Sequence, residues 1–398
     1  MQAQDQESAE TLLQRVIAFR DAHIYPNEAR FTEEVAAGPT RWKPVPVLEE
    51  LRTKARGEGL WNLALQGNGG PGLSHAQYAP IAEAMGGNEW APEVFNCHPP
   101  DTGNMAILRD FGTEAQKAAW LTPLLNGDIR TCFAMTEPEV ASSDATNIAL
   151  KAERCDGGWR IEGRKWWISG PGNPLCRLAI VMARTAPEAE RGRQHSTLLV
   201  PMDAPGVSVV RQLTIFGCDF APRGFSELKF ADVFVPDADV LGEPGMGFKI
   251  AQARLGGARV HHAMRCVGAA ERALRLMCER ASARVAFGKP IAQLGGAGEI
   301  IAQCRIEINM VRALILSTAA LMDNGAPARS EISQVKVAAP AMAARVIDAA
   351  MQMHGAAGLS QDTPLAALYA RIRSIRIADG PDAVHLRTIA REELALAR

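Results

Sequence analysis

Hydroxyl side chains, turn residues and two adjacent tryptophans gather between Thr131 and Gly170. Thr136-Glu137-Pro138 and Ser142-Ser143-Asp144 combine hydroxyl groups with turn-forming residues, and the main-chain N–H groups of such turns can hold a phosphate or the edge of a flavin. Taken alone, these residues are more often turn and capping residues, and Trp166-Trp167 is more often a core pair than a cofactor wall. The stretch therefore indicates a ligand surface without naming the ligand.

The apolar pattern changes its period around this stretch. Before Thr131 apolar residues recur at helical spacing, and Thr113 with Gln116 forms a capping-box pattern that opens a helix. Within the stretch apolar and polar residues alternate on either side of Asp156-Gly157-Gly158, which predicts a β-hairpin with these residues as its turn. Further strands are predicted at 178–184, 197–201, 207–213 and 228–235, and long helices at 300–322, 333–354 and 363–378.

These periods predict three consecutive domains in an α, β, α order. We expect an N-terminal helical domain over residues 1–130, a middle antiparallel β-barrel or sandwich over 131–238, and a C-terminal helical domain over 239–398. A chain of 398 residues is long enough for two or three such units.

Composition narrows the classes of function. A net charge of −1 gives no support for binding nucleic acid. The eight cysteines contain no C-x-x-C pair, so neither a zinc site nor a redox pair is expected, and buried reduced thiols are favoured. The first residues lack a secretory signal pattern, and no apolar run is long enough to span a membrane. We therefore expect a cytoplasmic protein.

Six sequence blocks, taken in their order along the chain, connect these separate segments to one pattern. They are C-F-A-M-T-E-P (132–138), S-S-D (142–144), K-W-W-I-S-G (165–170), R-V-A-F-G-K-P-I (284–291), Q-M-H-G-A-A-G (352–358) and A-D-G-P (378–381). In this order they resemble the acyl-CoA dehydrogenase family over essentially the whole chain. The resemblance implies an N-terminal helical domain, a middle β-domain and a C-terminal four-helix bundle, which bind FAD and an acyl-CoA thioester.

The resemblance assigns the flavin to residues of the middle domain. Thr136 would hydrogen-bond the ring, Trp167 would cover one face, and Ser169 would lie near N5, where threonine is more common in the family. Ser142 or Ser143 would meet the FAD pyrophosphate or the CoA, and the choice between them is open because this chain has one residue more than the usual pattern. The remaining expected flavin contacts here are Phe133, Ala134, Met135 and Ile168.

The far end of FAD would depend on a second copy of the chain. Arg284 matches an arginine that reaches the pyrophosphate of a neighbouring subunit's FAD, and Gln352 matches the start of a segment that meets the adenosine. A protein built this way is at least a homodimer, and the family is commonly homotetrameric. The other expected cofactor contacts of this region are Phe287, Gly355, Ala356 and Pro381.

The resemblance also supplies a catalytic base. Asp-Gly-Pro between two helices is by itself a helix stop, but here Asp379 takes the place of the glutamate that removes the substrate α-proton in the best-known members. Arg259 matches an arginine near the base and thioester, and Gly380 a substrate contact. Asp382 is a fallback base that also looks like a helix N-cap, and the alternative base position is Ala258.

The A-D-G-P motif is similar to one branch of the family, whose larger eukaryotic members carry a kinase-like domain before the dehydrogenase domain. His261 and His262 are interpreted as helix-surface or packing residues. Three functions are compared: an acyl-CoA dehydrogenase that passes electrons to an electron-transfer flavoprotein, an oxygen-dependent enzyme similar to nitroalkane oxidase, and a weakly catalytic flavoprotein that binds acyl-CoA.

Overall fold

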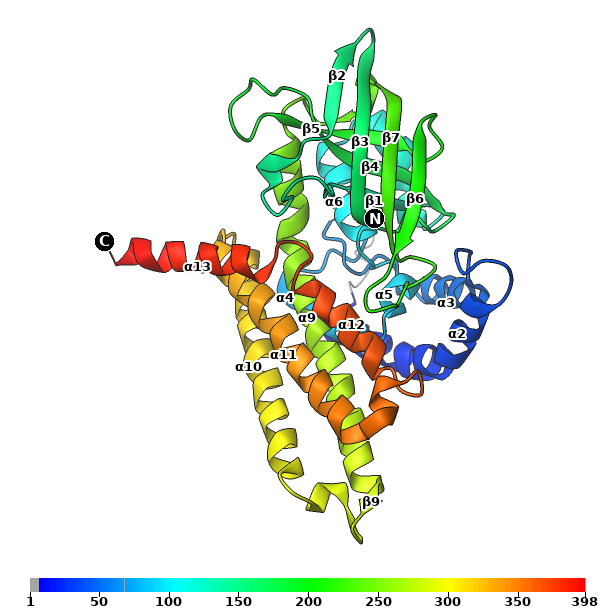
Figure 1. Cartoon of the computed structure of the whole chain (residues 1–398), viewed down its shortest axis with the longest axis vertical. Helices are drawn as coiled ribbons and strands as arrows, with labels where there is room; N and C mark the ends of the chain where they lie inside the picture. The colour runs from blue at the N-terminus through cyan, green and yellow to red at the C-terminus, as the bar shows by residue number, and fades with distance from the viewer. Residues whose placement is uncertain (1–6, 68, 398) are drawn as a thin grey trace. The chain divides into compact units, whose positions relative to one another are not determined.

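The computed structural model describes residues 7–67 and 69–397, which fall into two compact units. One unit is helical and combines the chain up to Pro26 with Gly72–Pro92 and the chain from Gly257 onward. The other unit contains the sheet and comprises Asn27–Pro71 and Glu93–Gly256. Both are drawn in Figure 1, with the sheet strands and the long C-terminal helices labelled.

The sheet unit is built on eight hydrogen-bonded strands. Seven follow the order β6-β7-β3-β2-β4-β5-β8, and β1 pairs with β4. The β1–β4 pairing is parallel, as is a short contact of β2 with β4, so the predicted antiparallel sheet is in fact mixed. The strands are β1 (Arg130–Ala134), β2 (Lys151–Cys155), β3 (Gly158–Ser169), β4 (Cys176–Arg184), β5 (His195–Pro201), β6 (Val207–Leu213), β7 (Phe225–Pro236) and β8 (Val240–Leu241).

The predicted hairpin exists as β2 and β3, which pair antiparallel. Gly157 turns the chain with φ +71°, whereas Gly158 pairs with Cys155 and Pro236 and is the first residue of β3. Placing Gly158 in the turn was therefore wrong. Its backbone lies so close to β7 that a Cβ atom would overlap the carbonyl oxygen of Val235, which explains the glycine at this strand position.

Six described helices precede or flank the strands; five lie in the sheet unit, and the division between the units runs through α5 after Pro92. The predicted capping box of Thr113 and Gln116 is present, and Gly127 ends the following helical segment with φ +79°. These helices are α2 (Glu28–Ala36), α3 (Pro46–Gly57), α5 (Ala91–Val94), α6 (Asp101–Phe111), α7 (Glu114–Gln116) and α8 (Thr122–Asn126). The long helix α9 (Gly247–Ala283) begins in this unit and continues into the helical unit.

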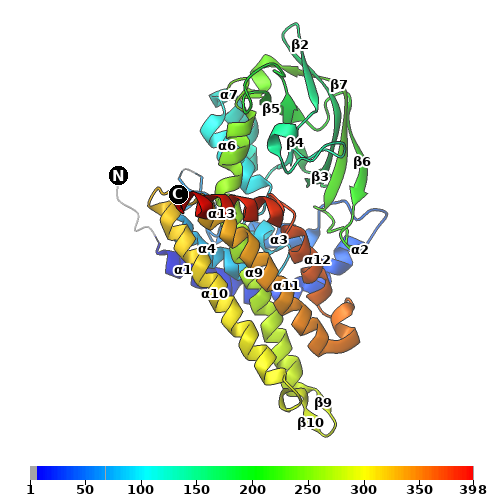
Figure 2. The same cartoon turned by 60° about the vertical axis from the view of Figure 1, so that its left-hand side comes forward.

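The helical unit combines two N-terminal helices with the C-terminal ones. Figure 2 shows α10 and α11 running side by side. The helices are α1 (Ala9–Phe19), α4 (His75–Met85), α10 (Ala297–Asp323), α11 (Arg329–His354), α12 (Leu365–Ile375) and α13 (Asp382–Leu396), with a short β9 (Val285–Ala286) and β10 (Lys289–Pro290) hairpin after α9. Five apolar residues that recur at helical spacing along α9 are all buried, namely Met264, Val267, Leu274, Met277 and Ala281.

Two glycines let α4 and α9 approach closely. A Cβ atom on Gly268 would overlap the main-chain oxygen of Glu83, and one on Gly86 would overlap the main chain of Arg265. Because neither glycine has a side chain, the two backbones meet directly. The N-terminal segment is thereby packed against a helix that follows almost two hundred residues later.

Helix α13 begins at Asp382, and Pro381 is its N-cap residue. The prediction that Asp382 caps this helix was therefore wrong. Its carboxylate instead binds Arg376, with 2.8 Å between Oδ2 and Nε, because the turn after α12 brings that guanidinium alongside. Among the described residues no helix is both long and apolar enough to cross a membrane. All eight cysteines are free thiols, five of them buried.

Candidate functional site

The chain leaving β1 is tied to the end of β3. The Thr136 hydroxyl donates to the carbonyl of Trp166 at 2.7 Å, and the Trp166 N–H donates to the carbonyl of Thr136 at 3.0 Å. Since its one proton is used, the hydroxyl keeps only acceptor capacity for a ligand. The ring of Phe133 lies 4.3 Å from the Arg254 guanidinium, and Ala134 is buried in the sheet.

A buried ion pair fixes this same segment from within. Lys165 has no exposed surface and Glu137 is 4% exposed. The ammonium donates to Glu137 Oε1 at 2.8 Å, to the carbonyl of Met135 at 2.8 Å and to that of Met182 at 2.7 Å. The carboxylate also accepts the N–H groups of residues 149 and 150. Burial lowers the pKa of Lys165 to about 8, and Glu137 partly offsets that effect.

The two serines after this segment have different environments. The Ser142 hydroxyl accepts the N–H of Glu137 at 2.9 Å and lies 3.2 Å from the carbonyl of Val140. Ser143 is exposed, and its hydroxyl makes no hydrogen bond within residues 7–67 and 69–397. Ser142 therefore closes the turn, whereas Ser143 retains both its donor and its acceptors for a ligand.

Trp167 interrupts the regular pairing of β3 with β7. The register shifts between Lys165 and Ile168, and Trp167 has φ +53°. A bulky residue with positive φ is a conformational outlier of the kind that accumulates at functional sites. Its side chain is 40% exposed, although tryptophan is usually well buried. Ile168 points into the core, and the Ser169 hydroxyl bonds to no other described residue.

The residues expected to meet a neighbouring copy lie on the surface of the helical unit. Arg284 is exposed, and its guanidinium makes no hydrogen bond or ion pair with the residues that the structure describes. Phe287 follows three residues later, has φ +47° and is 96% exposed. Gln352, Gly355 and Ala356 are exposed at the end of α11.

Hydrogen bonds to the main-chain oxygens of Asp379 and Gly380 hold this turn in place. Asp379 has φ +56° and Gly380 φ +102°. The carbonyl of Asp379 lies 3.2 Å from Arg259 Nε and 3.2 Å from His385 Nε2. Lys336, which is buried on α11, donates to the carbonyl of Gly380 at 3.1 Å. In the part of the chain that the structure describes, the N–H of Asp379 donates to no other residue.

Burial shifts the proton affinities of the groups that hold this turn. Burial, together with the nearby charges of Arg259 and Lys336, lowers the pKa of His385 to about 4. Burial also lowers the pKa of Arg259 and of Lys336, and the charge of Asp379 opposes both shifts. A neutral His385 donates from Nε2 to the carbonyl of Asp379, so the turn is held without a protonated imidazole.

His262 lies beside the Asp379 carboxylate. Its Nε2 is 3.6 Å from Asp379 Oδ2, and the two side chains are 11% and 22% exposed. His262 follows Arg259 by three residues on α9, so both side chains leave the same face of that helix. The interpretation of His262 as a simple surface or packing residue missed this contact. The i, i+3 spacing from Arg259 was the available signal.

His261 differs from its neighbour. It lies against the Tyr78 ring at 4.6 Å between ring centroids and within 3.5 Å of His75, and burial lowers its pKa well below the ordinary value. Its interpretation as a packing residue agrees with these contacts.

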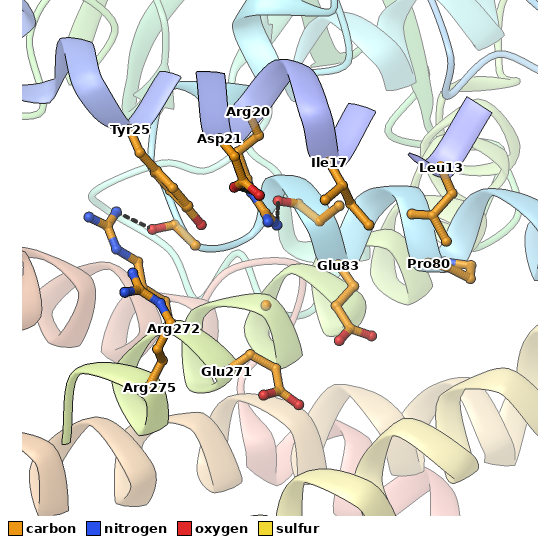
Figure 3. Close-up of a pocket in the computed structure, with 13 residues that line it drawn as sticks. Leu13, Ile17, Arg20, Asp21, Tyr25, Pro80, Glu83, Glu271, Arg272 and Arg275 are labelled. Carbon is orange, nitrogen blue, oxygen red and sulfur yellow. Dashed lines mark hydrogen bonds and ion pairs between the residues drawn. The ribbon is translucent and has the colours of Figure 1, made fainter. Parts of the chain in front are cut away.

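A separate pocket of about 830 Å³ opens between α1, α4 and α9 of the helical unit. Figure 3 shows the aliphatic side chains of Leu13 and Ile17 and charged groups that include Glu83 and Arg272 along its walls. Arg272 donates to the carbonyl of Gly87 at 2.6 Å. None of the predicted cofactor, substrate or catalytic residues lines this pocket.

Each unit therefore gathers part of the predicted site. The sheet unit brings Thr136, Trp167 and Ser169 to one end of β3, and the helical unit brings Arg259 and Gly380 to Asp379. Sequence reasoning missed the internal supports of both groups, which are Glu137, Lys165, Lys336 and His385. Glutamate followed by proline after an apolar strand, and lysine inside an alternating strand, were the signals for the buried pair.

Comparison with known proteins matches three consecutive family models. They are the N-terminal domain of acyl-CoA dehydrogenase at residues 6–128, the middle domain at 132–233 and the C-terminal domain at 245–394. A solved structure from Mycobacterium abscessus superimposes with a TM-score of 0.95 at 48% identity, covering all of both chains. An acyl-CoA dehydrogenase from Geobacillus kaustophilus gives 0.83 at 25% identity and covers 98% of each chain.

Curated relatives have a similar degree of identity. Acyl-CoA dehydrogenase family member 10 of Mus musculus is 48% identical over 96% of this chain and 36% of its own length. Acyl-CoA dehydrogenase family member 11 of Gallus gallus is 49% identical over 98% of this chain and 51% of its own length, so the chain spans about half or less of these two relatives. FadE2 of Mycobacterium tuberculosis is 50% identical, over 96% of this chain and 94% of that protein. With three family models covering most of its length, the chain belongs to the acyl-CoA dehydrogenase family.

Proposed function

We propose that the protein is an FAD-dependent dehydrogenase of acyl-CoA thioesters that introduces a double bond between Cα and Cβ. The observation that carries the proposal is Asp379. Its carboxylate is partly shielded, its backbone is in the left-handed conformation, and its main-chain N–H donates to no other residue that the structure describes. A carboxylate can accept the α-proton, and the adjacent N–H can stabilise negative charge on the thioester oxygen. Both are required for this reaction.

The residues of the sheet unit fit a flavin. A large aromatic ring is exposed at Trp167, and the hydroxyls of Ser143 and Ser169 make no hydrogen bond to any described residue. Thr136 would accept from the ring system, Trp167 would cover one face, and Ser143 would meet a phosphate of FAD or CoA. Bound FAD supplies the acceptor for the β-hydrogen as hydride. Ala134 and Ile168 are buried side chains, so they would contribute through the main chain.

The helical unit would provide the acid–base chemistry. Asp379 takes the α-proton as the C–H bond breaks, and Gly380 leaves room for the thioester because it has no side chain. Arg259 supports the base by binding its main-chain oxygen rather than its carboxylate. This arrangement fixes the backbone position without placing a guanidinium directly on the proton acceptor.

A second copy of the chain would complete the cofactor site. Arg284 is exposed and its guanidinium pairs with no other residue in the described ranges, so it suits a pyrophosphate. The segment of Gln352, Gly355 and Ala356 would meet the adenosine, while Phe287 and Pro381 would pack near the cofactor. We propose a homodimer or homotetramer, located in the cytoplasm, that passes its electrons to an electron-transfer flavoprotein.

Anaerobic mixing tests the reaction. The purified, FAD-loaded protein is mixed with butyryl-, octanoyl- and palmitoyl-CoA and, separately, with nitroethane, and flavin absorbance is followed. We expect bleaching by at least one saturated acyl-CoA, and Asp379→Asn should slow it by roughly 10²–10⁴-fold while retaining FAD. Bleaching by nitroethane alone would instead indicate an enzyme similar to nitroalkane oxidase. Tight CoA binding without bleaching would indicate a weakly catalytic flavoprotein.

A further inference from the structure

We propose that His262 is a positioning residue, whose neutral Nε2–H orients the carboxylate of Asp379 for proton abstraction. This inference rests on the proposed function and adds a residue to it. Within residues 7–67 and 69–397, His262 is the one basic side chain with a nitrogen within 4 Å of that carboxylate.

The tautomer of His262 follows from its other neighbour. Arg265 Nη2 lies 3.3 Å from His262 Nδ1. A guanidinium has only donors, so Nδ1 must accept, and a neutral imidazole then carries its proton on Nε2. That nitrogen faces Asp379 Oδ2. Arg259, His262 and Arg265 follow one another at intervals of three residues. Arg259 binds the main chain of the Asp379 turn, and Arg265 fixes the tautomer of His262.

Charged groups lie on both sides of the His262 ring. Arg265 Nη2 faces Nδ1 on one side of the ring, and the Asp379 carboxylate faces Nε2 on the other. Adding a proton at Nδ1 would turn that hydrogen bond into a contact between two donors. A neutral donor orients a carboxylate with less loss of basicity than a full positive charge would cause.

The distance of 3.6 Å exceeds a hydrogen bond. Catalytic contacts are commonly long before ligands bind and shorten in the complex. Arg259, His385 and Lys336 already hold the main-chain carbonyls of Asp379 and Gly380. The main chain of Asp379 is therefore fixed, whereas its carboxylate still requires a contact that orients it. Those bonds fix where the side chain begins. The contact with His262 would limit the rotation of the carboxylate group itself.

Two substitutions separate orientation from mere packing. His262→Leu removes the donor and keeps a comparable side-chain volume, whereas His262→Gln can place an amide N–H near the position of Nε2. We expect His262→Leu to slow the bleaching step by about 10–100-fold, and His262→Gln to restore most of that rate. The dissociation constant for acyl-CoA, the FAD content and the melting temperature should change little in either variant.

The control is His261→Gln, which alters the adjacent residue without changing any group that faces Asp379. Wild type, the three variants and Asp379→Asn are compared by anaerobic stopped-flow, and acyl-CoA binding is measured separately by calorimetry. Bleaching of wild type with an unchanged rate in His262→Leu overturns the role of His262 alone. Equal slowing in His262→Leu and His262→Gln overturns it as well. Wild-type protein that binds acyl-CoA but is never bleached overturns the proposed function, and the role of His262 with it.

Discussion

Replacing Glu137 by glutamine should destabilise the sheet unit far more than its small chemical change suggests. The variant removes the negative charge next to Lys165, whose ammonium is fully buried. It also disturbs the two N–H groups at residues 149 and 150, each of which lies 2.8 Å from a carboxylate oxygen. Glutamine offers only one acceptor oxygen, so its NH₂ group would face one of these donors.

Removing one partner of a buried pair costs about 3–5 kcal/mol, since the other charge stays buried without compensation. With roughly 2–4 °C of melting temperature per kcal/mol for a unit of this size, the midpoint should fall by about 6–20 °C. Thermal and urea unfolding of the FAD-saturated protein would measure this, because free FAD also stabilises the folded state. FAD affinity should fall as well, because Lys165 fixes the carbonyl of Met135.

Glu139→Gln is the matched control two residues away. Its ion pair with Arg164 spans 3.3 Å and its side chain is 60% exposed, so the expected loss is below about 1 kcal/mol. The double variant Glu137→Gln with Lys165→Met should be more stable than Glu137→Gln alone, since no unpaired ammonium remains. If Glu137→Gln proves no more harmful than Glu139→Gln, the buried pair does not support the segment as argued.

Three further predictions concern the turn at Asp379 and the serines. Gly380→Ala should lower stability by roughly 1–3 kcal/mol and slow flavin bleaching, because the residue has φ +102° and a Cβ would lie 2.8 Å from His385 Nε2; an unchanged melting curve and rate would contradict this. Ser143→Ala should weaken the binding of FAD or CoA in titrations without changing stability, whereas Ser142→Ala should cost about 1 kcal/mol of stability; identical behaviour of the two variants would refute the assignment. Below pH 6.5 the unfolded chain takes up a proton that folded His385 refuses until about pH 4, so stability should fall across that window, by at most about 3 kcal/mol for this residue. His385→Gln should flatten this part of the pH dependence of unfolding, and an unaltered slope would count against the buried neutral imidazole.

Local elements could be predicted from the sequence because their signals are local. Alternation of apolar residues identified the β2–β3 hairpin, and the capping box of Thr113 and Gln116 marked a helix start that the structure confirms. The predictions were wrong where the local structure depends on pairing with a segment far away in the sequence. The parallel pairing of β1 with β4 joins strands separated by two others in the sequence, and no period reveals it.

The candidate site shows the same division. The resemblance to the family assigned roles to Asp379, Thr136 and Trp167 because these residues lie in sequence motifs that match the family. These assignments are predictions. Sequence could not decide between Ser142 and Ser143, because the difference lies in a hydrogen bond to the N–H of Glu137. His262 was missed because its significance depends on a turn more than a hundred residues later in the chain.

The close crossing of α4 and α9 has a consequence for the order in which the helices can pack while the chain is synthesised. Helices α1 and α4 leave the ribosome early, yet the glycine contact that packs α4 needs Gly268, and α10 comes later still. Helix α4 contacts both α1 and α10, so its full set of helix neighbours exists only after α10 has been made. Every segment of the sheet unit precedes Gly257, so the helical unit is the one whose segments are completed last during synthesis.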